Sequence, residues 1–278
     1  MVNDRPLITK ISPTEWAEQW RPFFAKLLET QSHHPQRLMV AVVGPPGCGK
    51  SVFAEQLNWI IFRGFLGKEL RSVALQMDGF HYPNSYLETH HRVLSDGAKI
   101  PLSWVKGQPD TFNIEALRNA LGQLRACPEH VYWPGYSRIT HDAVPNAHKI
   151  HSSTNIVIVD GNYLLSPKPP FTGMKSLFDL GIYIEAPTAK ILSNLMERHM
   201  KGGKTMEEAK SWVKRIDLPN AKIAEQSKSF ADVIVQRTSE EDLTGVIWKG
   251  ELLSETFRAA IRYAAPAPKT DTEEDGIY

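Results

Sequence analysis

The chain has 278 residues, of which 42% are hydrophobic and 23% charged, the composition of an ordinary globular protein with room for a sizeable core. Its 32 Lys and Arg nearly balance its 31 Asp and Glu, so the sequence shows no electrostatic footprint for nucleic acid or an acidic membrane. It has two cysteines, no apolar run of about 18 residues and no signal-peptide pattern. We therefore expect a cytoplasmic protein with no nucleic-acid and no membrane partner.

The first predicted element is a helix over residues 14–31, in which large apolar side chains recur at helical spacing. We expect residues 1–36 to form a helical extension that packs on the core, with residues 32–36 as its linker. Residues 264–278 are rich in Pro and Ala and then acidic, which predicts a disordered tail. Residues 37–263 are expected to form the main domain.

The main domain contains short apolar segments rich in β-branched residues, which is typical of strands buried on both faces. Five are predicted: 38–43, 73–77, 155–160, 180–185 and 232–236. Helical patterns such as residues 113–125 fall between them. This alternation predicts an α/β fold with a doubly wound, parallel, five-stranded sheet flanked by helices. Ligands of such folds bind at the carboxyl ends of the strands, so the residues after each strand are the candidates for a site.

The first predicted strand runs into GPPGCGKS, which matches the phosphate-binding pattern G-x-x-x-x-G-K-[ST] in full. Glycines allow several backbone N–H groups to point at one phosphate, and the helix that follows adds its positive N-terminus. Lys50 is expected to reach the β and γ phosphates, and Ser51 to offer its hydroxyl to Mg²⁺. We interpret Cys48 as an inert small residue rather than a redox switch. The candidate nucleotide-binding residues are Gly44, Pro45, Pro46, Gly47, Cys48, Gly49, Lys50, Ser51 and Val52.

Two aspartates follow predicted strands. Asp78, in the sequence DGFH, can accept a proton from a substrate hydroxyl, or it can be a turn residue before Gly79. Asp160 is typical of a carboxylate that acts on Mg²⁺ or on its waters, again with a turn as the alternative. His81 is a candidate for a hydrogen bond to substrate, with a structural histidine as the other interpretation.

A glycine pair at residues 202–203 separates two predicted helices in the segment of about 188–220. Arg198 lies near the end of the first helix, and Thr205 with Glu208 has the spacing of a capping box for the second. Cationic residues surround the pair. We expect a lid that is mobile without ligand, excludes water when closed and brings positive charge to a transferred group. An ordinary helical hairpin with solvated lysines is the alternative.

Several stretches together resemble the P-loop kinases of the uridine kinase, pantothenate kinase and phosphoribulokinase group. These stretches are GPPGCGKS, MDGFHYPN, KGQPDTFN, PGYSRITHD, VDGNYLL and the lid region ending in DLPNA, within roughly residues 37–237. The chain looks most like the branch named nucleoside/nucleotide kinase-like or "fructose transport system kinase". That name says little about the true substrate.

The resemblance implies a role for each matching position. Asp78 would be the base that takes the proton of the substrate hydroxyl, and Lys50 and Ser51 would hold ATP and Mg²⁺. Arg198 would act from the lid. Positions that match the acceptor pocket are Lys106, Tyr136 and Arg138, and Asn220 matches a position near the nucleotide.

One position departs from the family pattern. Family members usually have Glu-Gly after the third strand, whereas this chain has Asp160-Gly161. The shorter side chain leaves open whether Asp160 contacts the metal directly.

The leading hypothesis is ATP-dependent transfer of the γ-phosphoryl to a hydroxyl of a small metabolite that is pantothenate-, nucleoside- or sugar-like. A P-loop GTPase or motor is disfavoured because the chain has no N-K-x-D motif, and nucleoside monophosphate kinases lack a strand-end DGFH. A nucleotide-binding regulatory protein without transfer activity is the remaining alternative, although Lys50, Ser51, Asp78 and Arg198 together argue against lost catalysis. The sequence does not determine the acceptor or the oligomeric state, and it is compatible with a homodimer.

Overall fold

The computed structural model describes residues 11–64, 70–238 and 242–249. The predicted tail, the last part of the main domain and the first ten residues of the extension lie outside the described residues. Within these ranges, no helix has the length and apolar character needed to cross a bilayer.

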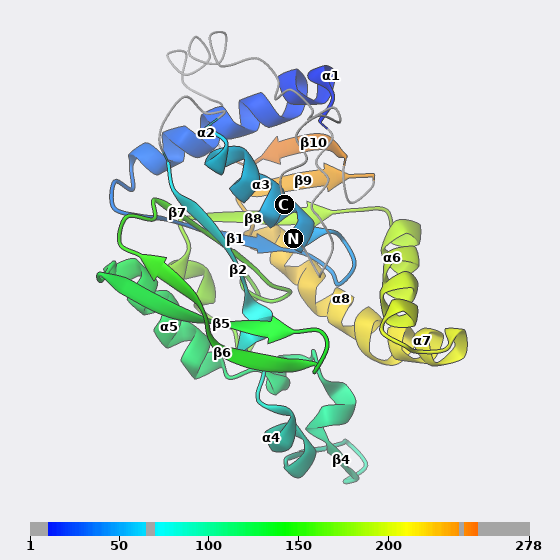
Figure 1. Ribbon diagram of the computed structural model, residues 1–278. Coiled ribbons are helices and arrows are strands. Elements are labelled where there is room, and N and C mark those ends of the chain that lie inside the picture. Colours follow the sequence, from blue (N-terminus) through cyan, green and yellow to red (C-terminus); the bar gives the residue numbers. More distant parts are fainter. Residues whose placement is uncertain (1–10, 65–69, 239–241, 250–278) are drawn as a thin grey trace.

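A central sheet organises the chain (Figure 1). The five predicted strands are confirmed as β1 (Leu38–Val43), β2 (Ser72–Gln76), β7 (Ile156–Asp160), β8 (Leu180–Glu185) and β9 (Val233–Arg237). They run parallel in the order β9-β8-β1-β7-β2. Their carboxyl ends therefore meet at one edge of the sheet.

The prediction of five strands, all parallel, is corrected by one further strand. β10 (Leu243–Trp248) pairs antiparallel with β9, so the described sheet has six strands. β10 has only one neighbour in the sheet, and several of its side chains are partly or fully exposed. It therefore lacks the continuous apolar run by which the five parallel strands were recognised.

Each face of the sheet is covered by helices, as the doubly wound fold requires. The side chains of β1 alternate between two clusters: Leu38, Val40 and Val42 in one, and Met39, Ala41 and Val43 in the other. The first cluster includes residues of α2 (Arg21–Ser32) and α3 (Lys50–Phe62). The second includes α5 (Ile114–Ala126). Figure 1 shows α2 and α3 away from α5 across the sheet.

The predicted N-terminal helix is present, but it is not regular throughout. A short helix, α1 (Pro13–Glu15), leads into a π-helical turn (Trp16–Trp20) and then into α2. Pro22 has no N–H to donate to the preceding helical turn, and the π-helical turn Trp16–Trp20 directly precedes α2. Trp20 is fully buried and stacks on Phe24 and Phe53 at centroid distances of 5.8 and 5.6 Å. The extension is therefore held to α3 by aromatic packing.

The chain between β2 and β7 carries further helices and strands, of which α5 packs on one face of the sheet. They are α4 (Asn84–Thr89), β3 (His91–Val93), β4 (Lys99–Pro101), α5, β5 (His130–Ser137) and β6 (Asp142–His151). The β5–β6 hairpin was not predicted, because β5 contains Pro134-Gly135 and most of β6 is exposed and polar. Trp133 fixes the hairpin to the sheet by donating from Nε1 to the carbonyl of Gln76 at 3.0 Å.

The predicted lid consists of α6 (Thr188–Lys201), α7 (Met206–Trp212), a π-helical turn (Val213–Asp217) and α8 (Leu218–Glu225). α6 and α7 project from the body of the molecule (Figure 1). The predicted capping box is confirmed, since Thr205 accepts from the backbone of Glu208 and Glu208 accepts from that of Thr205. The remaining short turns are 3₁₀-helical: Met77–Phe80, Leu102–Val105, Pro109–Thr111, Met174–Leu177 and Gln226–Phe230.

Candidate active site

The phosphate-binding loop connects β1 to α3 in a shape that suits an anion. Gly47 has φ +83°, and a Cβ at this position would lie 2.8 Å from Cγ of Leu195 on α6. Among the described residues, no side chain caps the N-terminus of α3, which begins at Lys50, so the N–H groups of its first turn can bind a phosphate. The loop therefore fits the phosphates of a nucleotide.

Ser51 and Asp160 meet beside this loop. Oγ of Ser51 donates to Oδ2 of Asp160 at 2.5 Å, although the two residues come from α3 and from the end of β7. Burial raises the pKa of Asp160 to about 6, against the opposing effects of Lys50 and of the Ser51 hydrogen bond. A buried carboxylate and a hydroxyl are hard oxygen ligands, so the pair fits Mg²⁺ with phosphate and water as the other ligands.

Asp78 lies in the 3₁₀ turn that follows β2, and its side chain is 36% exposed. The turn packs closely on the hairpin, since a Cβ at Gly79 would lie 2.3 Å from the carbonyl oxygen of Pro134. Enclosure alone would raise the pKa of Asp78, but the charge of His81 when its ring is protonated, together with the permanent charges of Arg138, Lys50 and Arg198, outweighs it and lowers the pKa. Asp78 is therefore ionised at neutral pH and able to accept a proton.

The predicted acceptor residues gather around Asp78. Nη2 of Arg138 lies 4.0 Å from its Oδ2. Nδ1 of His81 donates to the carbonyl of Asp78 at 2.8 Å, and the His81 ring lies 5.4 Å from the ring of Tyr136. Nζ of Lys106 lies 5.4 Å from the same Tyr136 ring. Lys106, Tyr136 and Arg138 are thus brought together by the structure, as the resemblance implies.

Burial lowers the pKa of His81, and its ring lies 3.8 Å from that of Phe112. Nδ1 of His81 carries the proton that is donated to the backbone carbonyl of Asp78. In the neutral ring the lone pair is therefore on Nε2. Nε2 is buried and has no hydrogen-bond partner among the described residues. His81 is therefore equipped to accept a hydrogen bond from a bound molecule.

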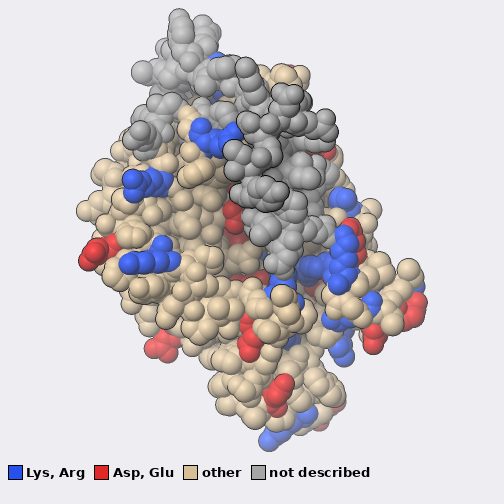
Figure 2. Space-filling model, viewed as in Figure 1, with Lys and Arg blue, Asp and Glu red and all other residues tan. Residues whose placement is uncertain are grey.

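Arg198 pairs with Asp217, which lies in the π-helical turn before α8 that we call the base of the lid. Its Nη2 lies 3.3 Å from Oδ1 of Asp217, whose other oxygen pairs with Nε2 of His199 at 2.7 Å. The charge of Arg198 nevertheless contributes to the lowered pKa of Asp78. Figure 2 shows further Lys and Arg side chains on the side of the molecule formed by α6 and α7.

The Phosphoribulokinase / Uridine kinase family model matches residues 39–244. The chain belongs to this family. It is therefore an ATP-dependent kinase of small molecules, with a P-loop that holds the nucleotide.

Individual relatives agree with this assignment. The chain is 32% identical over 222 residues to the uncharacterised protein YggC of Escherichia coli, covering 79% of this kinase and 86% of YggC. It is 29% identical over 168 residues to a pantothenate kinase of Parvibaculum lavamentivorans, covering 58% of this kinase but 48% of that enzyme. A crystal structure from Silicibacter, described as a candidate fructose transport system kinase, is 28% identical with a TM-score of 0.61, covering 72% of this kinase and 93% of that chain.

The structure of the kinase reveals two further residues at the phosphate-binding loop. Arg237, the last residue of β9, is buried and donates to Gln56 at 2.9 Å and to the carbonyl of Gly49 at 3.5 Å. Asn194 of α6 donates to the carbonyl of Gly47 at 2.9 Å. A charge at the end of an apolar strand could have pointed to Arg237, whereas nothing in the sequence distinguishes Asn194 from a solvated helix residue.

Asn220 is bonded to the residue that follows Lys106. It is 2% exposed, and its Nδ2 donates to the carbonyl of Gly107 at 3.1 Å. Gly107 directly follows Lys106, so the structure places Asn220 beside the predicted acceptor residues.

Proposed function

We propose that this kinase transfers the γ-phosphoryl of ATP to a hydroxyl of a pantothenate-, nucleoside- or sugar-like metabolite. The observation that carries the proposal is the position of Asp78. Its pKa is lowered both by His81 and Arg138, which are predicted to face the acceptor, and by Lys50 and Arg198, which are predicted to face the phosphates. A general base for phosphoryl transfer is required at such a junction.

In the proposed reaction, Asp78 accepts the proton of the acceptor hydroxyl as its oxygen bonds to the γ-phosphorus. The bond between that phosphorus and the β–γ bridging oxygen breaks, ADP leaves with the electron pair, and Asp78 later returns its proton to solvent. Lys50 and Arg198 neutralise negative charge on the phosphates as it shifts. Mg²⁺, when held by Ser51 and Asp160, supplies further neutralisation of the phosphates.

Three acceptor candidates follow from the relatives: pantothenate, uridine from the family description, and fructose from the Silicibacter structure. The pocket residues suit a polar molecule with several hydroxyls, because His81 offers an acceptor and Lys106 and Arg138 offer donors. The cations favour an acceptor that also carries a negative charge, which pantothenate has and the other two lack.

The test is ATP consumption with Mg²⁺ and each of the three acceptors, compared with no acceptor and with the Asp78→Asn variant. We expect one of them to stimulate ADP formation and to yield a phosphorylated product by mass spectrometry. ATP binding by calorimetry without acceptor-stimulated turnover, repeated with a wider library of hydroxyl compounds, would instead support the nucleotide-binding regulatory protein.

A further inference from the structure

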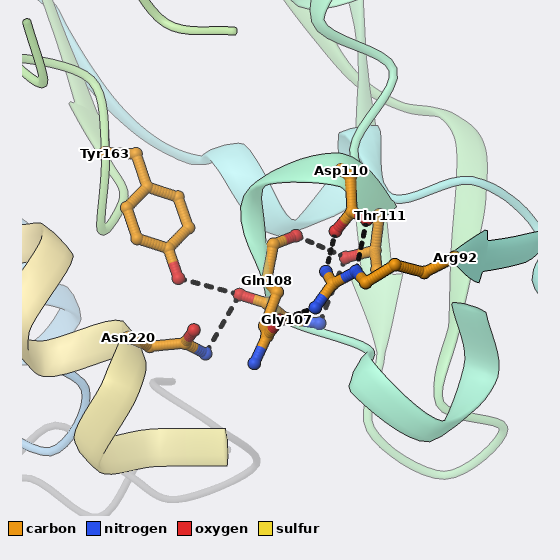
Figure 3. Close-up of polar contacts among 7 residues, drawn as sticks. All are labelled: Arg92, Gly107, Gln108, Asp110, Thr111, Tyr163 and Asn220. Atoms are coloured by element: carbon orange, nitrogen blue, oxygen red, sulfur yellow. Dashed lines mark hydrogen bonds and ion pairs between the residues drawn. The ribbon is translucent and has the colours of Figure 1, made fainter. Parts of the chain in front are cut away.

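The backbone carbonyl of Gly107 accepts two side-chain hydrogen bonds from distant parts of the chain (Figure 3). The Tyr163 hydroxyl donates at 2.8 Å, and Nδ2 of Asn220 donates at 3.1 Å. Both side chains are buried, at 0% and 2% exposure. A carbonyl oxygen has two lone pairs, so it accommodates both donors.

The two donors come from elements that already belong to the site. Tyr163 follows β7, three residues after Asp160. Asn220 lies on α8, directly after the π-helical turn whose Asp217 holds Arg198. One carbonyl therefore joins the strand end that carries Asp160 to the base of the lid.

We call residues 106–111 the acceptor segment. Its turn is closed internally, because the amide of Gly107 donates to Oγ1 of Thr111 at 3.1 Å and that hydroxyl donates to the carbonyl of Gln108 at 2.7 Å. Arg92 of β3 adds bonds to the side chains of Asp110 and Gln108 (Figure 3). Figure 3 shows these contacts on the opposite side of the segment from Tyr163 and Asn220.

The acceptor segment and Asn113, just beyond it, are also bonded to the turn that carries Asp78 and to Tyr82 after that turn. The amide of Tyr82 donates to the carbonyl of Thr111 at 3.0 Å, and that of Asn113 donates to the carbonyl of Phe80 at 2.7 Å. At the other end, Nζ of Lys106 donates to Oδ1 of Asn84 at 2.6 Å and to the carbonyl of His141 at 2.5 Å. The segment thus spans the proposed acceptor pocket, and a shift at Gly107 moves the backbone of Lys106.

We propose that Tyr163 and Asn220 are positioning residues that hold the acceptor segment through the Gly107 carbonyl. They couple the acceptor pocket to the Asp160 strand end and to the base of the lid. The inference rests on the proposed function, because Lys106 has its acceptor role from there. In this proposal, Asn220 holds the acceptor segment instead of contacting the nucleotide directly.

The kinetic test uses Tyr163→Phe, Asn220→Ala and the double variant, with Mg-ATP and whichever of pantothenate, uridine and fructose supports turnover. Tyr163→Phe removes only the hydroxyl and keeps the ring against Phe171, which lies 5.3 Å away. Each single variant should raise the acceptor KM by roughly tenfold, the size of one hydrogen bond, with the ATP KM within about twofold of wild type. Tyr132→Phe, at an exposed tyrosine of β5, is the matched control and should change neither constant.

The double variant gives a signature specific to a shared acceptor. Each single variant leaves the carbonyl one donor, whereas the double variant leaves it none, so the acceptor KM should rise by more than the product of the two single effects. A raised ATP KM with an unchanged acceptor KM in Asn220→Ala would overturn the proposal and return Asn220 to the nucleotide. Wild-type constants in all variants, with only a lower melting temperature, would also overturn it.

A second measurement separates this inference from the proposed function. Amide hydrogen exchange followed by mass spectrometry, without any acceptor, should be faster over residues 106–111 in both single variants and unchanged over the phosphate-binding loop. If none of the three acceptors is phosphorylated, faster exchange in this segment still supports the proposal that Tyr163 and Asn220 hold Gly107. Unchanged exchange over residues 106–111 in both single variants would overturn this proposal, whatever the kinetics show.

Discussion

Asn194 of α6 donates a hydrogen bond from Nδ2 to the carbonyl of Gly47 at 2.9 Å, which attaches the first lid helix to the phosphate-binding loop. Leu195, the next residue, fills the space where a side chain at Gly47 would lie. The loop that receives the phosphates is thus braced by the helix that carries Arg198. We therefore expect nucleotide binding and lid position to be linked through this contact.

The first prediction concerns that brace. Asn194→Ala removes the bond to Gly47 and should weaken ATP binding by roughly five- to tenfold, the effect of one hydrogen bond. Isothermal titration with a non-hydrolysable ATP analogue measures it. Ser193→Ala, at the exposed neighbouring position, serves as the control and should bind as wild type. Equal affinities of Asn194→Ala and Ser193→Ala for the ATP analogue would mean that the hydrogen bond to Gly47 does not shape the loop.

Lys50→Ala should reduce ATP turnover by about 10²–10³-fold, because it removes a charge directed at the β and γ phosphates. The fold should remain intact, since Lys50 is only partly buried and belongs to neither core cluster. Circular dichroism and a melting curve check the fold, and a coupled ADP assay checks the activity. Turnover at the wild-type rate in a folded variant would refute the phosphate-loop assignment.

Asp78→Asn should keep nucleotide affinity and lose phosphoryl transfer by roughly 10²–10⁴-fold, the usual contribution of a general base. The amide has nearly the same shape but does not take up the proton. Single-turnover transfer and ATP titration separate the two effects. Lost ATP affinity with intact transfer would make Asp78 a nucleotide or metal residue instead of the base.

Arg198→Ala should lower kcat by about 10²–10³-fold and change the ATP KM far less, because its charge acts mainly on the transition state. Lys201→Ala is a matched control one turn nearer the helix end, where the lysine is exposed and paired with Glu197. We also expect hydrogen exchange over residues 198–210 to slow when ATP analogue and acceptor are both present. An effect of Arg198→Ala on KM alone would identify the arginine as a binding residue, and slow exchange without ligand would identify a rigid hairpin.

The raised pKa of Asp160 predicts a pH-dependent stability for the metal-free protein. Burial raises this pKa to about 6 in the folded chain, against 3.8 for a free side chain. The ionised carboxylate is therefore disfavoured by folding. The destabilisation is absent below about pH 4 and complete above about pH 6, where it reaches about 3 kcal/mol at most.

Asp160→Asn removes this cost and retains an oxygen that accepts from Ser51. Its melting temperature relative to wild type should therefore rise between pH 4 and pH 7 in the presence of EDTA, while Mg-ATP binding weakens. A difference in melting temperature that stays constant over this range would show that Asp160 is not held at a raised pKa.

The sequence alone determined the strands and loops whose signals are local. An inner parallel strand such as β1 is apolar along its whole length, and GPPGCGKS is a contiguous pattern whose chemistry depends on each residue in it. Asp78 and Asp160 were recognised because a parallel sheet brings its carboxyl ends to one edge. The signal for the capping box likewise lies within the four residues from Thr205 to Glu208.

Only the tertiary structure decided the contacts between segments far apart in the chain. β10 and the β5–β6 hairpin are half exposed, so their patterns resemble those of loops until a partner strand is in place. The bond from Asn194 to Gly47 spans 147 residues, and that from Asn220 to Gly107 spans 113. An asparagine amide bonds equally well to water or to any carbonyl, so its partner is chosen by the packing of α6 and α8 and not by the residues beside it.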